Sequence, residues 1–137
     1  LELYAAEGFD QDSDALTVVP FIESMEVVYE WADFVICRAG ALTVAELTSA
    51  GLGALLIPFP YAIDDHQTAN GQLLVDHGAA EMIQQINLTP ENLAAIITDI
   101  TMDSEKRLAM AINARALAKN GAAQQVADMC LEVANGQ

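Results

Sequence analysis

The sequence predicts a protein of the α/β class, with a parallel sheet flanked by helices. Short apolar runs of the kind that form buried strands alternate along the chain with segments of helical periodicity. Glycine or proline separates the two kinds of segment, as at Pro20, Gly40 and Pro58. Parallel strands joined through helices have right-handed crossovers, and ligands bind at the carboxyl ends of such strands. The ends of the predicted strands are therefore the first place to look for a binding site.

The expected elements follow one another in a regular order. Apolar strands are expected at residues 16–19, 34–37, 53–57 and 80–83, the last at an edge of the sheet. Helices are expected at residues 25–32, 42–50, 67–77, 90–100, 104–118 and 122–133. The strand at 34–37 has the continuous apolar character of a strand covered on both faces. We expect the C-terminal helices to pack back against the sheet.

Charge and composition limit the classes of partner. The net charge of −15 and the pI near 4.1 argue against binding of nucleic acid and of anionic lipid, because the long-range field of the protein repels both. Residues 1–105 hold 18 of the 20 acidic side chains and one of the five cations, a formal charge of −17. Phosphate binding in that part therefore depends on short-range donors. The 53% hydrophobic content is typical of a single well-packed domain.

The cysteines and the ends of the chain bear on its compartment and completeness. Cys37 lies in an expected strand and Cys130 in an expected helix, and we interpret both as reduced core residues of a cytoplasmic protein. No apolar run approaches the length that crosses a bilayer. The first residue is not methionine, and Leu1–Glu7 resembles the end of a helix, so we expect a piece of a longer chain.

The segment from Cys37 to Leu47 reads as a buried strand that turns through Gly40 into a helix. If this helix begins near Gly40 or Ala41, the backbone N–H groups of residues 41–43 have no intrahelical partner and lie at the positive end of the helix dipole. An anionic diphosphate fits that end of a helix. This junction is the strongest candidate site in the sequence.

Three side chains near this junction each have two interpretations. Glu46 lies one turn into the helix and can accept hydrogen bonds from a ribose, or it can form a capping box with Thr43. Gly40 either admits a ligand or is an ordinary tight-turn residue. Arg38 is the one cation of the acidic part, and it is either a phosphate contact or a structural ion-pair partner.

Two further segments follow predicted strands. Phe21 and Ile22 follow the first strand, where they can pack against a planar ring and bind its edge, or belong to the core. The polar stretch 64–70 follows the third strand and offers groups suited to sugar hydroxyls, although it also reads as a solvated helix start capped by Asp64 or Asp65. His66 beside these aspartates is a poor metal site, so no metal is expected. No serine lies in an elbow motif, so a Ser/His/Asp nucleophile is not expected either.

Taken together, several of these segments resemble the C-terminal domain of the MurG family. These are the glycosyltransferases that move N-acetylglucosamine from UDP onto the 4-hydroxyl of lipid-linked muramoyl pentapeptide in peptidoglycan synthesis. The likeness runs in order from about residue 16 to residue 86, with looser helical similarity to the end. It is carried by residues 19–25 (VPFIESM), 29–33 (YEWAD), 37–47 (CRAGALTVAEL), 58–59 (PF) and 66–70 (HQTAN).

The resemblance implies a parallel Rossmann-like sheet flanked by helices, the C-terminal domain of a GT-B glycosyltransferase, incomplete at its N-terminus. It implies that the backbone of Ile22 binds the uracil edge and that Glu46 binds the ribose. The start of the helix that contains Glu46 would hold the diphosphate. The family usually has glutamine where His66 stands, and the loop before it is one residue longer here. The full set of donor-binding residues implied by the resemblance and the junction is Phe21, Ile22, Met25, Arg38, Gly40, Ala41, Leu42, Thr43, Glu46, His66, Gln67 and Asn70.

The resemblance also implies an inverting displacement without metal or other cofactor, in which residues 1–137 form the donor domain. The catalytic base and the site for the lipid acceptor would belong to a separate N-terminal domain, so this chain alone would bind UDP-N-acetylglucosamine and transfer nothing. The whole protein would be peripheral on the inner face of the bacterial membrane, with no direct membrane contact by this segment. Alternatives are a donor-binding domain or subunit of another nucleotide-sugar enzyme, as in the eukaryotic dolichol pathway, and a structural α/β domain without ligand.

Overall fold

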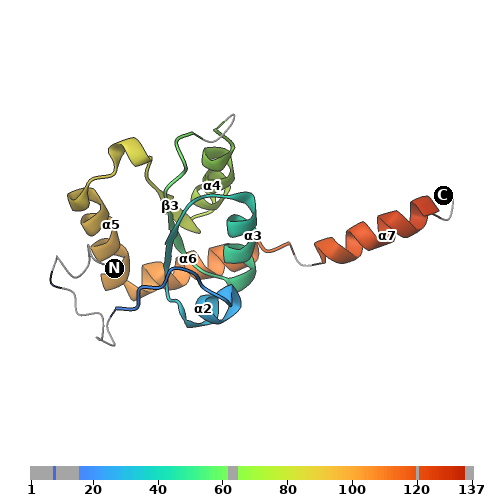
Figure 1. The fold of residues 1–137 in the computed structure, drawn as a ribbon, viewed down its shortest axis with the longest axis horizontal. Coiled ribbons are helices and arrows are strands. Elements are labelled where there is room, and N and C mark those ends of the chain that lie inside the picture. Colours follow the sequence, from blue (N-terminus) through green and yellow to red (C-terminus); the bar gives the residue numbers. More distant parts are fainter. Residues whose placement is uncertain (1–7, 9–15, 62–64, 120, 135–137) are drawn as a thin grey trace.

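The computed structural model describes residue 8 and residues 16–61, 65–119 and 121–134 (Figure 1). In this part of the chain three short strands form one sheet: β1 (Val35–Cys37), β2 (Ala54–Leu56) and β3 (Ala80–Met82). The helices are α2 (Met25–Trp31), α3 (Ala41–Ala50), α4 (His66–Asp76), α5 (Pro90–Met102), α6 (Ser104–Ala116) and α7 (Ala122–Ala134), with a 3-10 turn η2 at Gln85–Asn87. The expected helix at Leu1–Glu7 lies outside the described residues.

The sheet is parallel, with the strand order β1-β2-β3. Ile36 pairs with Leu55, and Leu55 pairs with Glu81, so the three strands run in register. The predicted α/β class and three of the four predicted strands are confirmed. The predicted strand at 16–19 is wrong: these residues form no ladder with β1 in the described part of the chain, and an apolar run becomes a strand only where a neighbour pairs with it.

The main core lies on the face of the sheet that α3 and α4 cover. Ala54 and Leu56 of β2 pack there against Leu47 of α3 and Leu74 of α4, and all four are fully buried. Gly71 allows this close approach, because a Cβ at that position would lie 3.1 to 3.3 Å from side chains of both the sheet and the loop after β1. The sheet therefore fixes where α4 begins relative to the strand ends.

The opposite face of the sheet is covered unevenly. Leu55 of β2 is fully buried, whereas Ile36 of β1 keeps 43% of its surface exposed. The expectation that the strand at 34–37 is covered on both faces is therefore wrong. Leu55 lies in the central strand, between β1 and β3, whereas β1 has a neighbour on one side only in the described sheet, so fewer side chains surround Ile36 on this face.

Helix α6 lies against the loops that enter the strands. A Cβ at Gly53, just before β2, would lie 2.8 Å from the Cβ of Met110. The side-chain amide of Asn113 donates to the carbonyl of Gly78, just before β3, at 3.1 Å. Because α6 occupies the side where strands begin, the carboxyl edge of the sheet is left to the loops and helix starts that follow β1 and β2.

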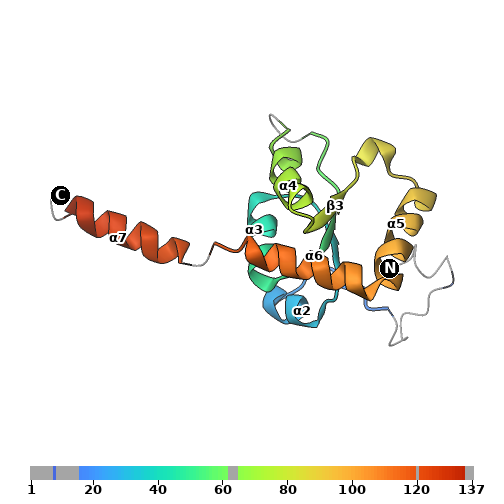
Figure 2. The same ribbon diagram turned by 180° about the vertical axis from the view of Figure 1, so that it is seen from behind.

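The C-terminal helices behave differently from one another. Packing back against the sheet is confirmed for α6, because its Ala114 belongs to the same buried cluster as Ala54 and Leu56 of β2, and α5 packs on α6. Lys106 of α6 also bridges Glu81 of β3 and Asp99 of α5 at 2.6 Å each. Helix α7 extends away from the rest of the fold (Figures 1 and 2), and the residues described in it from 124 onward are exposed. The expected packing of this helix and the expected core position of Cys130 are therefore wrong, because an apolar stripe does not specify the surface that covers it.

Candidate functional site

The loops that follow β1 and β2 meet at the carboxyl edge of the sheet. Arg38, directly after β1, donates from Nη1 to the carbonyls of Ile57 and Pro58 at 3.1 and 3.0 Å. Its guanidinium also lies over the ring of Phe59, 5.6 Å from the centroid. Arg38 therefore holds the two loops together through carbonyls and not through a carboxylate, and the ion-pair interpretation is wrong among the described residues. A phosphate contact by its other N–H groups stays a prediction.

The first two turns of α4 are tied to the same loops. The side-chain oxygen of Gln67 accepts from the backbone N–H of Phe59 at 3.0 Å. The side-chain amide of Asn70 donates to the carbonyl of Ala39 at 3.3 Å. These bonds use the oxygen of Gln67 and the nitrogen of Asn70, so the other polar atom of each amide is the one that suits a ligand. The structure thus places Asn70 beside the loop that leads into α3 and Gln67 beside the loop after β2.

Helix α3 begins without a side-chain cap. Gly40 is its N-cap residue, and the first intrahelical bond runs from the N–H of Val44 to the carbonyl of Gly40 at 2.9 Å. The N–H groups of Ala41, Leu42 and Thr43 precede that bond, and no side-chain cap bond is present at this end. The first turn also contains no acidic residue. This end of α3 therefore carries the positive partial charge of the helix with no carboxylate in its first turn.

The glycine at position 40 is not explained by local conformation or packing. Its φ is −65°, a value open to any residue, so the tight-turn interpretation is wrong. A Cβ there would meet only Thr43 Oγ1, at an ordinary 3.6 Å. The missing side chain leaves room in front of the first N–H groups of α3.

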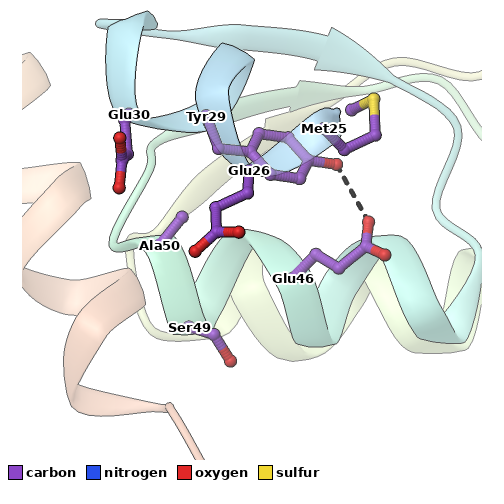
Figure 3. Close-up of a pocket in the computed structure, with 7 residues that line it drawn as sticks. All are labelled: Met25, Glu26, Tyr29, Glu30, Glu46, Ser49 and Ala50. Atoms are coloured by element: carbon purple, nitrogen blue, oxygen red, sulfur yellow. Dashed lines mark hydrogen bonds between the residues drawn. The ribbon is translucent and has the colours of Figure 1, made fainter. Parts of the chain in front are cut away.

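The capping-box interpretation of Thr43 and Glu46 is also wrong. Because α3 starts at Ala41, Thr43 lies inside the first turn and is not the N-cap residue. The carboxylate of Glu46 points toward α2, where its Oε2 accepts from the hydroxyl of Tyr29 at 3.0 Å (Figure 3). Glu46 therefore faces a neighbouring helix and not its own backbone.

Helices α2 and α3 line an open cavity of about 520 Å³ beside this carboxylate. Figure 3 shows the side chains that line it: Met25, Glu26, Tyr29, Glu30, Glu46, Ser49 and Ala50. The volume is within the range of small-molecule sites in proteins. Three of the lining groups are carboxylates, so the cavity disfavours phosphate and favours ligands that donate hydroxyl or N–H groups. Burial and the hydrogen bond to Glu46 raise the pKa of Tyr29 to about 12, so this phenol stays a donor.

The segment before α2 lies open to solvent. Phe21 is 77% exposed and Ile22 is 37% exposed, so the interpretation of these two as core residues is wrong. Met25, the first residue of α2, lines the cavity beside Glu46. The structure therefore brings together Met25 and Glu46 of the predicted set. Contact of Phe21 and Ile22 with an aromatic base stays a prediction.

The start of α4 differs from the expected capped helix. Asp65 is the N-cap residue, with a φ of 52°, and its carboxylate accepts from the hydroxyl of Thr68 at 2.6 Å instead of capping a backbone N–H. Asp64 lies outside the described residues. His66 is the first residue of α4, next to Gln67. Over the described ranges no group of three or more histidine, cysteine or acidic residues is placed to hold a metal.

Tyr29 contacts a predicted site residue, Glu46, but the sequence alone predicted no role for it. It follows Met25 by four residues, which places both on one side of α2. That spacing is the signal that could have pointed to it. The bond to Glu46, 17 residues away, depends on how α2 packs on α3 and cannot be read from spacing.

The parallel strands, with an uncapped helix start and polar groups at their carboxyl ends, form an α/β domain of the kind that binds ligands at this edge of the sheet. Residues 4–131 match the glycosyltransferase family 28 C-terminal domain, and the chain belongs to this family.

Similar proteins agree on one enzyme. The chain is 51% identical over 132 residues to the UDP-N-acetylglucosamine--N-acetylmuramyl-(pentapeptide) pyrophosphoryl-undecaprenol N-acetylglucosamine transferase of Marinobacter nauticus, covering 96% of the chain and 36% of that protein. It is 56% identical over 119 residues to the enzyme of the same name from Azotobacter vinelandii, covering 87% and 33%. The crystal structure of Acinetobacter baumannii MurG superposes with a TM-score of 0.78 and 48% identity, covering 82% of this chain and 34% of that one.

The chain spans about a third of the length of the relatives it matches. The family description places the match in their C-terminal part. The expected α/β domain of a GT-B glycosyltransferase and the resemblance to the MurG family are thereby confirmed. In the described part of the chain no helix has the length and apolar character needed to cross a bilayer.

Proposed function

We propose that this chain binds UDP-N-acetylglucosamine as the donor half of an inverting N-acetylglucosaminyltransferase of peptidoglycan synthesis. One observation carries the proposal: the uncapped start of α3 and the Glu46 carboxylate lie on one helix, and Glu46 lines the cavity between α2 and α3. Leu42 and Glu46 are four residues apart, which is about 6 Å along the helix axis. A nucleoside diphosphate needs donors for its phosphates and acceptors for its ribose diol at about that separation.

The diphosphate would bind at the N–H groups of Ala41, Leu42 and Thr43, in the space that Gly40 leaves open. These donors and the helix dipole would also stabilise the charge that develops on the leaving UDP, in the role that a metal has in other enzymes. Arg38 lies next to this point and would add a charged donor.

The two ends of the donor would extend to either side. The uracil would pack near Phe21 and Met25, with its edge on the backbone of Ile22. The N-acetylglucosamine would lie at the start of α4, within reach of Gln67 and Asn70, with His66 beside them. Because those two amides already hold the loops after β1 and β2, the sugar would bind to groups that are fixed before it arrives.

We place the acceptor and the catalytic base outside these residues. The relatives are named for transfer to an undecaprenol-linked muramyl pentapeptide, and about two thirds of their length lies beyond the match. A separate N-terminal domain would bind that lipid at the inner face of the cytoplasmic membrane. The acidic character of this chain would keep it from direct contact with anionic lipid.

The Glu46→Ala variant tests this proposal. Loss of a ribose contact should cost about 1.5 to 3 kcal/mol of UDP binding free energy, as for other hydrogen bonds to charged groups, with little change in melting temperature. Isothermal titration of the wild type and the variant with UDP measures it, and Ser49→Ala, which removes a hydroxyl from the same cavity, is the matched control. Unchanged affinity with a lowered melting temperature would favour a structural domain without ligand.

A further inference from the structure

Tyr29 and Glu46 form a link across the cavity between α2 and α3. The phenol donates to Oε2 of the carboxylate at 3.0 Å, and Figure 3 shows both side chains reaching toward each other from their helices. The ring of Tyr29 packs against the buried core, so the phenol is held in place from behind. The glutamate side chain lies on an exposed face of α3 and has no comparable packing of its own. The tyrosine is therefore the fixed member of the pair.

The bond leaves acceptor capacity on the carboxylate. An ionised carboxylate offers about four lone-pair sites, and the phenol occupies one of them. The sites that remain on its two oxygens are enough for both hydroxyls of a vicinal diol. A carboxylate already held in one orientation loses less side-chain freedom when it binds, and this raises its affinity for a ligand.

The charges around the cavity explain why the Glu46 carboxylate needs a hydrogen bond to hold its orientation. Glu26 and Glu30 line the same cavity, and like charges nearby would drive a free Glu46 carboxylate to turn outward. Tyr29 supplies a neutral donor against this repulsion. The phenol is neutral at physiological pH, as tyrosine ordinarily is, and burial raises its pKa further, to about 12.

We infer that Tyr29 is a positioning residue for nucleotide recognition: its hydroxyl holds the Glu46 carboxylate so that the remaining lone pairs meet the 2′- and 3′-hydroxyls of a ribonucleotide. The inference rests on the proposed function, since it requires Glu46 to bind the ribose. Its consequence is selectivity for ribonucleotides, because a positioned carboxylate gains the most from a ligand that presents both hydroxyls.

The test is Tyr29→Phe, which keeps the ring and its core contacts and removes the donor. UDP and 2′-deoxy-UDP are titrated into wild type, Tyr29→Phe, Glu46→Ala and the double variant, with Ser49→Ala as the control from the same cavity. We expect Tyr29→Phe to weaken UDP binding by about three- to tenfold and 2′-deoxy-UDP binding by less, so that discrimination between the two falls. In the Glu46→Ala background the same change should alter neither affinity.

The contrary outcomes are distinct. If Glu46→Ala weakens UDP binding and Tyr29→Phe lowers only the melting temperature, the phenol joins two helices and positions nothing, and the inference fails alone. If Tyr29→Phe weakens both nucleotides equally, or weakens UDP in the Glu46→Ala background, Tyr29 acts on the ligand by another route and the inference is overturned. If the wild type binds no UDP, or Glu46→Ala leaves its affinity unchanged, the proposed function fails and the inference fails with it.

Discussion

Helices α3 and α5 begin in opposite ways. At α5 the hydroxyl of Thr89 accepts from the N–H of Asn92 at 3.2 Å, Pro90 fills the first position, and Glu91 places a carboxylate in the first turn. Hydrogen bonds from its own backbone and from Thr89 hold the pKa of Glu91 below its ordinary value. At α3 the N-cap is glycine and the first turn has neither a cap bond nor an acidic side chain.

The difference shows how one physical requirement can serve stability or binding. Every helix start exposes N–H groups that need an acceptor. Helix α5 supplies these acceptors from its own side chains, and so does α6, where Asp103 accepts from Lys106 N–H at 2.9 Å. Helix α3 follows β1 directly and presents its N–H groups at the carboxyl edge of the sheet without such a side chain. We interpret the first kind of start as structural and the second as a place for an external anion.

The largest expected effect concerns transfer itself. The chain of residues 1–137 should show no N-acetylglucosaminyl transfer from labelled donor to a soluble lipid-acceptor analogue, because donor carbon, acceptor hydroxyl and base must come within about 3 to 3.5 Å and this chain supplies only the donor side. Transfer should appear when the chain replaces the matching C-terminal third of Acinetobacter baumannii MurG. Comparable rates for the chain alone and the hybrid would place the base among residues 1–137, with His66 the first candidate.

An acidic side chain in the first turn of α3 should make the start of this helix resemble that of α5, which has its own carboxylate near the N–H groups. Leu42 is 80% exposed, and Leu42→Glu places a carboxylate where Glu91 stands in α5. Repulsion should weaken UDP binding by at least about tenfold, while the helix dipole should raise the free energy of unfolding by about 0.3 to 1 kcal/mol. Titration calorimetry and urea denaturation measure the two quantities.

Two variants control for shape and for net charge. Leu42→Gln has nearly the same size as the glutamate variant without its charge, and it should bind UDP much more tightly than Leu42→Glu. Ile86→Glu adds the same charge at a residue that is 90% exposed on η2, and it should leave affinity unchanged. Equal affinities for Leu42→Glu and Leu42→Gln would show that no anion binds at this helix start.

Removal of the cap at α5 should lower stability and leave UDP affinity unchanged, the opposite of the result expected for Leu42→Glu. Thr89→Ala should lower the free energy of unfolding by about 1 kcal/mol, because the N–H of Asn92 loses its acceptor. UDP affinity should stay within about twofold of wild type. A loss of affinity as large as that of Glu46→Ala would mean that α5 and the site are coupled, and the distinction between the two helix starts would not hold.

The last expected effect is confined to alkaline pH, where the protein should lose stability. The folded chain raises the pKa of Tyr29 from 10.0 to about 12, mainly by burial, so the folded state binds this proton more tightly than the unfolded state. The resulting stabilisation is complete below pH 10 and is lost as the pH rises toward 12. Urea denaturation of wild type and Tyr29→Phe between pH 9 and about 12 checks this, and parallel curves for the two proteins would contradict it.

The sequence predicted the elements well where local pattern decides them. The bounds of α2, α3 and α4 differ from those expected by one residue, because glycine, proline and periodicity mark such ends directly. It failed where a partner decides the structure. Residues 16–19 have the composition of a strand but no neighbour in the described sheet. Helix α7 has an apolar stripe, and none of the described residues forms a surface that covers it.

In the candidate site, too, features set by local sequence could be predicted, whereas features set by contacts between distant residues could not. The junction after β1 could be located from its glycine and the strand before it. The order of the donor contacts rests on the family resemblance and stays a prediction. The capping box failed because a shift of three residues in the helix start moves Thr43 from the cap into the first turn. The roles of Arg38 and Tyr29 depend on contacts with residues 57–58 and with Glu46, which only the folded chain brings together.

Amide chemical shifts measured during a UDP titration test the central claim most directly. In the ¹⁵N-labelled chain, the N–H signals of Ala41, Leu42 and Thr43 should move most, because these groups would donate to the diphosphate. The signal of Asn92, whose N–H is already bonded to Thr89, should stay where it is. No movement at residues 41–43, or equal movement at the starts of α3 and α5, would contradict the account.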